Sequence, residues 1–226
     1  MPQKLYCMKT RIIIILLLIN IIPSFSQNRL TPETRVVSMS SFEYYQRVDS
    51  LLFSKENGRY KFALQVLPSF APEYGLVYSL EAKQLILREA NMNIWYGKRQ
   101  LPKIEEYRLS ITTEYADKLD SLLLSAVLSS SYLSDSRGHD GTVYNFRVDR
   151  GRYSASCWSP KNGNCARLVS ITEEICKGVK FNDTSILDEL SPEIDLLTNA
   201  FLDLLPEGGR LMDENGVLLI ESKPKL

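Results

Sequence analysis

The chain has few of the residues from which metal sites and disulfide scaffolds are built. It contains one histidine, His139, and four cysteines among its 226 residues. The cysteines show no C-x-x-C spacing, and no second histidine is present to form an H-x-x-x-H pair. The sequence therefore predicts no metal site and no cofactor.

An excess of charge of either sign is also missing. The 27 Lys and Arg residues are balanced by 27 Asp and Glu residues. A protein that follows nucleic-acid phosphates needs an excess of basic residues concentrated on one face. We therefore expect no nucleic-acid partner.

Long hydrophobic runs are absent except for Ile12 to Ile22, which follows three basic residues. Eleven residues rise only about 16 Å as a helix, roughly half of a hydrocarbon core. Ser24-Phe25-Ser26 then supplies small residues at the two positions that a signal peptidase reads. We interpret residues 1–26 as a signal peptide cleaved after Ser26. An uncleaved membrane anchor is the alternative.

Export would change both the charge and the number of cysteines. Cleavage removes three basic residues and no acidic ones, which leaves 24 basic against 27 acidic residues, a net charge of −3. Cys157, Cys165 and Cys176 remain, and an odd number excludes complete pairing within one chain. Gln27 occupies the position that the acylated cysteine of a lipoprotein would need. We expect a soluble protein in the periplasm or outside a bacterial cell, with no membrane span after cleavage.

Residues 27–40 are polar, contain Pro32 and show no periodicity, which predicts a flexible leader. Residues 41–226 are long enough for one core, so we expect a single α+β domain. Two packed lobes with a break near residues 97–110 are the alternative.

Hydrophobic periodicity divides this domain into helices and strands. Helices are expected over 41–57, over 113–133, from about 163, and from Ser191 as N-cap with Pro192 at the first helical position. Strands are expected over 60–66 with one buried face, 76–80, 84–89 extended by 92–96, 142–148 and 153–157, with a small hairpin within 209–220.

This order of elements favours an α+β fold. Its sheet is expected to be mainly antiparallel, built from hairpins, and packed against three to four amphipathic helices. A doubly wound parallel fold is the alternative. No strand-to-helix turn, however, is glycine-rich in the manner of a phosphate cradle.

The sequence selects no catalytic residue. His139 precedes Asp140 directly, and adjacent side chains rarely orient each other as a triad requires. No serine lies in a G-x-S-x-G elbow, and no spacing selects a pair of carboxylates. Cys157 ends a predicted strand, which is typical of a structural thiol.

The three thiols are restricted in how they can pair. Cys165 and Cys176 lie about 16 Å apart along one predicted helix, beyond the reach of a disulfide. Two states are expected: either all three are reduced and buried, or Cys157 pairs with Cys165 and Cys176 stays free.

Two aromatic and polar segments are the best candidates for a binding surface. Trp95 and Tyr96 precede a basic Gly-Lys-Arg sequence, and Trp158 opens a polar loop that includes Lys161 and Asn162. Strand alternation points Trp158 away from the side of Cys157. Tryptophan, tyrosine and arginine in loops at a sheet edge are typical of recognition surfaces. The alternative is that both tryptophans cap the core.

The leading hypothesis is an exported, non-catalytic module that binds a protein or an envelope component. The alternative is a secreted or periplasmic hydrolase whose site is assembled around His139 or Cys157. Convergent polar partners around either residue in a pocket would favour the hydrolase, and a shallow aromatic surface would favour binding.

The signal peptide generates the first testable prediction. Protein purified after export should begin at Gln27, because the small residues before it form the cleavage site. Intact mass spectrometry measures this directly, allowing for cyclisation of the terminal glutamine. A mature chain that keeps residues 12–22 would contradict both the cleavage and the soluble assignment.

Overall fold

The computed structural model describes residues 27–33, 39–56, 59–96, 101–132, 140–205, 211–212 and 218–219. The helices are α2 (Met39–Leu52), the 3-10 helix η1 (Ser54–Glu56), α3 (Thr113–Leu128), α4 (Gly163–Phe181) and α5 (Ser185–Leu202). The strands of the main sheet are β1 (Thr31–Pro32), β2 (Tyr60–Pro68), β3 (Tyr74–Ser79), β4 (Gln84–Ala90), β5 (Ile104–Ser110), β6 (Thr142–Val148) and β7 (Tyr153–Trp158). A separate pair is β8 (Leu211–Met212) with β9 (Leu218–Leu219).

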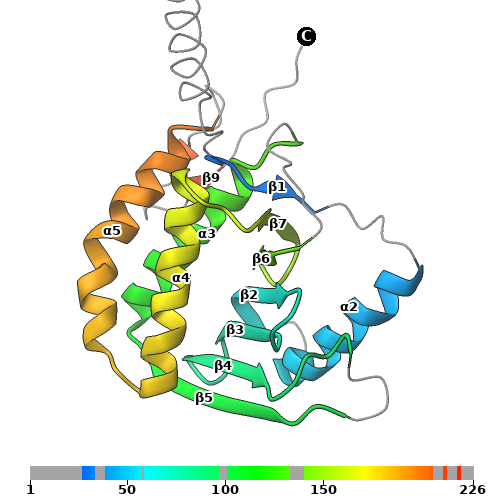
Figure 1. Ribbon diagram of the computed structural model, residues 1–226. Helices are drawn as coiled ribbons and strands as arrows, with labels where there is room; N and C mark the ends of the chain where they lie inside the picture. Colours follow the sequence, from blue (N-terminus) through cyan, green and yellow to red (C-terminus); the bar gives the residue numbers. More distant parts are fainter. Residues whose placement is uncertain are drawn as a thin grey trace, which may run out of the picture.

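One antiparallel sheet of seven strands organises the described part of the chain. Its order is β1-β7-β6-β2-β3-β4-β5, and β2, at the centre, joins the β3–β4–β5 meander to the β6–β7 hairpin. Helices α3, α4 and α5 lie on one side of the sheet, and α2 lies on the other (Figure 1). The α+β fold with an antiparallel sheet is thereby confirmed.

The larger core lies between the sheet and α3, α4 and α5. The strands supply the alternate residues that point toward these helices, such as Phe62 and Leu64 of β2 and Phe146 of β6. One face of α4 packs against them, and its residues Cys165, Leu168, Val169, Thr172, Ile175 and Cys176 are all buried. Burial of these apolar side chains on both sides of the interface is the main force that holds the two layers together.

A second core lies on the opposite side of the sheet, beneath α2. Val48 and Leu52 of the helix contact the other set of β2 residues, including Ala63 and Leu67. The prediction of a strand with a single buried face over 60–66 is therefore wrong. Alternate side chains of β2 face two different cores, instead of one core and the solvent.

Gly75 of β3 allows the chain after α2 to approach the sheet closely. A Cβ atom at this position would lie 2.4 Å from Cζ of Phe53, which is closer than carbon atoms can pack. The absence of a side chain at Gly75 thus makes room for the Phe53 ring in the second core.

The N-terminal segment is part of the fold. Leu30 is buried in the larger core, and Thr31 pairs with Ser156 of β7. The backbone amides of Asn164 and Cys165, at the start of α4, donate hydrogen bonds to the Asn28 side chain and the Gln27 carbonyl. Residues 27–33 therefore differ from the flexible leader that the sequence predicts, because their contacts come from distant parts of the chain.

Three further elements differ from the sequence prediction. β5 was not predicted. It lies within residues 97–110, the proposed break between two lobes, and it pairs with β4 in the main sheet. Residues 92–96 form a bend and a turn after β4 rather than an extension of it. α5 begins at Ser185, and Pro192 lies inside it. Leu187 and Ile194, on either side of this proline, are both buried in the larger core.

All three cysteines of the described chain are reduced and buried, which is the first of the two predicted states. The pKa of the Cys157 thiol is raised well above its usual value by a hydrogen bond with Cys165 and by burial. The two thiols therefore meet inside the larger core, between β7 and the first turn of α4.

A buried arginine connects the second core to the edge of the sheet. Arg88 of β4 is 1% exposed, and its guanidinium donates to Glu56 of η1 at 2.5 Å and to Glu106 of β5 at 2.8 Å. It also donates to the Leu52 carbonyl at the end of α2 at 2.8 Å. Each arm of the guanidinium thus has a partner, as a buried charge requires.

The Arg88 cluster predicts how stability changes with pH. Partial burial alone would raise the pKa of Glu106, but hydrogen bonds from Arg88, Arg108 and a lysine lower it from 4.5 to about 2. A carboxyl with a depressed pKa contributes stability above its unfolded pKa and loses it as the pH falls toward the folded one. Glu106→Gln should therefore lower the free energy of unfolding at pH 6, by an amount that shrinks between pH 4.5 and pH 2.

Urea unfolding over this pH range measures the effect. Glu105→Gln is the matched control, because it removes the same charge from β5 without removing a partner of Arg88. A difference between wild type and Glu106→Gln that stays constant from pH 6 to pH 2 would contradict the assignment.

Candidate functional site: an aromatic surface at one end of the sheet

The loops that carry the predicted binding residues lie at one end of the sheet. Pro68 at the end of β2 pairs with Thr142 at the start of β6, whose next residue pairs with Trp158 at the end of β7. Because neighbouring strands are antiparallel, the loops after β2 and β4 lie at this same end. The structure thus brings both predicted segments to one end of the fold.

A buried glutamate holds the loop after β4 in place. Glu73 is fully buried, and its Oε2 atom accepts a hydrogen bond from the Ile94 amide at 2.6 Å. Its Oε1 atom accepts from the Trp95 amide at 3.4 Å and from the Tyr44 hydroxyl at 2.9 Å. One carboxylate therefore joins the loop before β3, the loop after β4 and helix α2.

Aromatic stacking reinforces this junction. The Tyr44 ring meets the Trp95 ring edge to face, with 4.9 Å between centroids, and meets Tyr45 at 5.4 Å. Burial, together with the charge and the hydrogen bond of Glu73, raises the pKa of Tyr44, which keeps the phenol protonated as a donor. Trp95 is consequently held on one side by α2.

The asparagine side chains of the loop after β4 form hydrogen bonds with neighbouring backbone groups. Asn93 donates to the Ala71 carbonyl at 2.9 Å and accepts from the Tyr96 amide at 3.1 Å. Asn91 accepts from the Lys103 amide at 2.9 Å. These bonds connect the loops after β2 and β4 to each other and link the two described parts of the β4–β5 connection.

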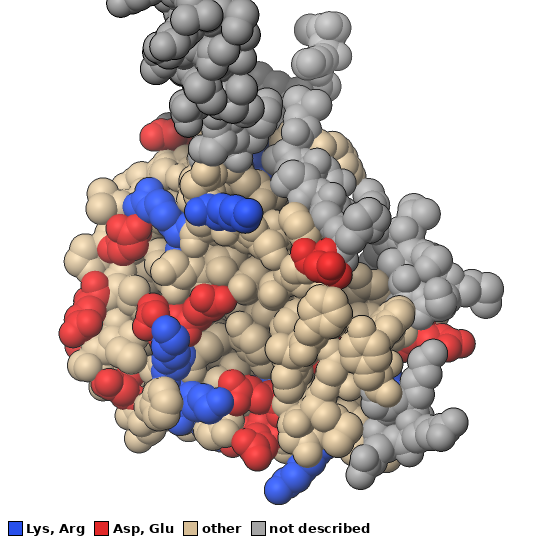
Figure 2. Space-filling model, viewed as in Figure 1, with Lys and Arg blue, Asp and Glu red and all other residues tan. Residues whose placement is uncertain are grey.

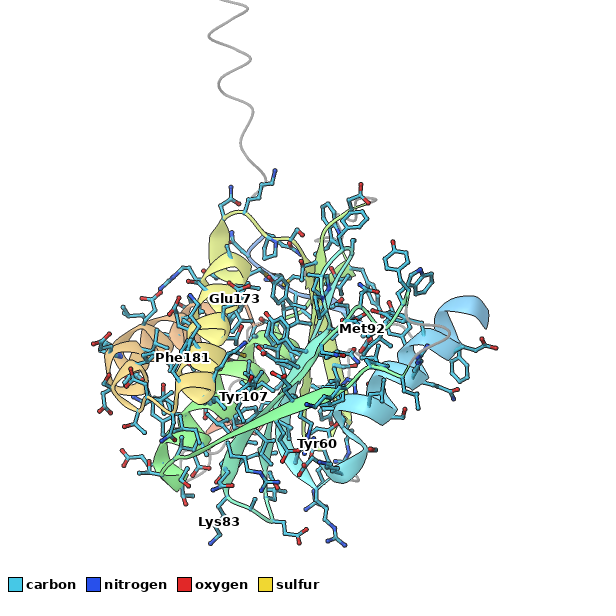
Figure 3. The ribbon with its side chains drawn as sticks, turned by 60° about the horizontal axis from the view of Figure 1, so that its bottom comes forward. Tyr60, Lys83, Met92, Tyr107, Glu173 and Phe181 are labelled. Atoms are coloured by element: carbon cyan, nitrogen blue, oxygen red, sulfur yellow. The ribbon has the colours of Figure 1, made fainter. Side chains whose placement is uncertain are left out.

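Large apolar side chains lie exposed on these loops. Phe70 is 75% exposed, Trp95 42%, Tyr96 65% and Leu101 80%. We call these four residues the aromatic patch. In Figure 3, Met92 marks the loop after β4 on the side of the sheet where α2 lies, and Glu173 and Phe181 of α4 mark the opposite side.

The helical side of the molecule carries many charged residues of both signs. In the view of Figure 2, Lys and Arg alternate with Asp and Glu over α4 and α5, whereas the area toward α2 is mainly uncharged. Ion pairs such as Arg167 with Glu193 connect these two helices at the surface. The helical side therefore has the mixed charge of an ordinary solvated surface.

The second predicted segment forms a tight corner between β6 and β7. Thr142 and Ser159 exchange hydrogen bonds, with the Ser159 amide donating to the Thr142 carbonyl at 2.8 Å. A Cβ atom on Gly141, whose φ is +158°, would lie 2.7 Å from the Trp158 ring. Trp158 is accordingly half-buried against the backbone, and Lys161 is exposed in the loop that follows.

The two tryptophans do not share one contact surface. β7 and β4 are four strand positions apart in the sheet, a separation of roughly 19 Å at about 4.8 Å per strand. Asn162 precedes α4 as its N-cap residue without a side-chain capping bond. Trp95 and Tyr96 therefore belong to the aromatic patch, whereas Trp158, Lys161 and Asn162 form a separate corner at the same end.

The residues proposed for the alternative hydrolase are placed differently. His139 lies outside the described residues. Cys157 is 2% exposed and faces Cys165 rather than a base, and its raised pKa keeps the thiol protonated. A cysteine nucleophile needs the opposite conditions, a depressed pKa and access to substrate.

The sequence was compared with protein-family models and with curated proteins. No protein-family model matches the chain, and no curated protein matches it. Within the described ranges, no three His, Cys, Asp or Glu residues are grouped so that they could hold a metal ion. No helix in that part of the chain has the length and apolarity to cross a membrane.

The Glu73 junction generates a prediction. Glu73→Gln replaces one of the accepting oxygens by an NH2 group, which cannot accept the hydrogen bonds made there. We expect a loss of about 1–3 kcal/mol in the free energy of unfolding, the scale of a buried polar group left without its partner. In a Trp158→Phe background, the fluorescence of Trp95 should also shift to the red.

Urea unfolding followed by fluorescence tests both effects. Glu81→Gln is the matched control, because its carboxylate is exposed in a surface ion pair with Arg59, which contributes little to stability. Equal stability of the two variants would show that Glu73 does not hold the loop.

Proposed function

We propose that the protein is an exported, non-catalytic binding module that recognises a protein or an envelope component. The aromatic patch is its main contact surface, and the Trp158 corner, which lies apart from the patch at the same end of the sheet, is a separate second contact site. Residues 1–26 support export, because they have the composition and cleavage site of a signal peptide.

The observation that carries the proposal is the exposure of large apolar side chains on loops that the buried Glu73 and the side chains of Asn91 and Asn93 hold by hydrogen bonds. Exposed apolar residues scattered over a surface need no explanation, but a contiguous group marks an interaction site. Glu73 and Tyr44 fix the loop before any partner arrives. Little conformational entropy is then lost on binding, which favours affinity.

The surroundings of Cys157 support a binding module over the hydrolase. Its thiol is enclosed between β7 and α4, where substrate has no access, and its polar neighbour is another thiol. A cysteine hydrolase would need a base at that position.

A capture experiment with the mature protein tests the proposed function. Immobilised wild-type protein and the double variant Trp95→Ala/Tyr96→Ala are exposed to detergent-solubilised envelope of the source cells, and the captured material is quantified. Capture by the double variant should fall at least about 10-fold, as expected when central aromatic contacts are removed.

Phe181→Ala is the matched control, because it removes an aromatic ring that is 73% exposed at the end of α4, on the other side of the sheet. Capture by this variant should equal that of wild type. Equal capture by wild type and the double variant would overturn the proposal.

A further inference from the structure

Two thiols from different elements lie side by side in the larger core. Cys157 is the residue before the last one of β7, and Cys165 lies in the first turn of α4. They are 2% and 0% exposed, and a hydrogen bond joins their side chains. A disulfide holds its two sulfur atoms at about 2.05 Å, so thiols that are already in hydrogen-bond contact need only a short approach to become bridged.

The third cysteine of the described chain does not compete for either of these thiols. Cys176 lies eleven residues after Cys165 in the same helix, which places it about 16 Å further along the axis. That separation is far beyond the reach of a disulfide. The structure therefore selects Cys157 and Cys165 as a pair and leaves Cys176 single.

The pair spans the loop of the Trp158 corner. Residues 158–164 lie between the two cysteines, and they include Trp158, Lys161 and Asn162. A bond between the cysteines would close a short ring that carries all three of these predicted binding residues.

The backbone of this loop turns sharply from β7 into α4. Ser159 has a φ of +37° and Gly163 a φ of +78°. A positive φ is unfavourable for serine, because its Cβ atom crowds the backbone, whereas glycine adopts it freely. A covalent link between the two ends of the loop would help to hold this conformation.

We propose that Cys157 and Cys165 form a disulfide when the chain folds in an oxidising compartment, and that this bridge holds the Trp158 corner in place. The inference rests on the export that is part of the proposed function, because disulfides persist outside the cytosol. It requires no binding partner.

The oxidant is a small or protein disulfide of the compartment, such as oxidised glutathione. One cysteine thiolate attacks this disulfide and expels a first thiol, and the second cysteine thiolate then displaces the other thiol. The protein loses two S–H bonds and gains one S–S bond. The oxidant loses its S–S bond and takes up the two protons as two thiols.

Burial determines when this reaction takes place. Both thiols are enclosed in the folded protein, where an oxidant has no access to them. The bridge therefore forms during folding, before α4 has packed against the sheet. The same burial then protects it from reductants.

Refolding of the mature chain tests the pairing. The reduced chain is refolded from urea in a buffer with equal amounts of oxidised and reduced glutathione, and the remaining thiols are alkylated after denaturation. We expect one alkylated thiol, at Cys176, and a linked peptide that joins Cys157 to Cys165 in a non-reducing map. Three alkylated thiols, or a link that includes Cys176, would overturn the proposal.

Two variants control the assignment. Cys176→Ser should keep the link, because it removes the thiol that is too distant to pair. Cys165→Ser should leave both Cys157 and Cys176 open to alkylation, and a link between these two would contradict the geometry. The map of wild type decides the pairing even if a variant does not fold.

Hydrogen exchange tests the effect of the bridge on the corner. Amides of residues 158–164 should exchange at least about 10-fold more slowly in the bridged than in the reduced protein, because local opening is restricted. Residues 91–96, in the loop after β4, are the internal control and should exchange equally in both forms. The bridged protein should also unfold at a temperature roughly 5–10 °C higher. Equal exchange of residues 158–164 in the two forms would show that the bridge does not hold the corner.

These results are independent of the capture experiment, which depends on Trp95 and Tyr96. A chain that stays reduced overturns the disulfide and leaves the proposed binding function standing. Capture that does not depend on the two aromatic residues overturns the binding function and leaves the disulfide standing.

Discussion

The need to neutralise one buried charge, that of Arg88, determines how the second side of the sheet is built. Its guanidinium donates to the Leu52 carbonyl at the end of α2 and to the carboxylates of Glu56 in η1 and Glu106 in the edge strand β5, so three elements are fixed by one side chain. These contacts hold α2 across the sheet, so that its aromatic residues lie over the loop before β3 and the loop after β4. Tyr44, near the start of α2, then reaches Glu73 and Trp95. The geometry of the aromatic patch thus depends on a charge that lies at the far end of the helix.

Sequence periodicity predicted the parts of the fold that are determined locally. The antiparallel hairpins and the stripe of α4 follow from the spacing of apolar residues, and the structure confirms them. β5 was missed because Glu105, Glu106 and Arg108 hide its alternation. The burial of Arg88 and Glu73 was also missed. Their partners lie 18 to 36 and 21 to 29 residues away, so no local pattern indicates them.

The sequence predicted only part of the candidate site, because the rest of the site also depends on the tertiary fold. Trp95 and Tyr96 were identified because two large aromatic residues beside a basic sequence are unusual in a loop. Phe70 and Leu101 were not, since single apolar residues in loops are common and their exposure depends on the tertiary fold. The sequence also grouped Trp158 with Trp95, and only the strand order shows how far apart they lie.

Both edges of the main sheet are poor templates for an added strand. One edge, β1, is only two residues long and includes Pro32, which has no amide hydrogen to donate. The other, β5, carries Glu105, Glu106 and Arg108 along its length. Many binding modules recognise an extended peptide by adding it to the edge of their sheet as an extra strand. That mode is disfavoured here, and the same features protect the sheet from pairing with other copies of itself.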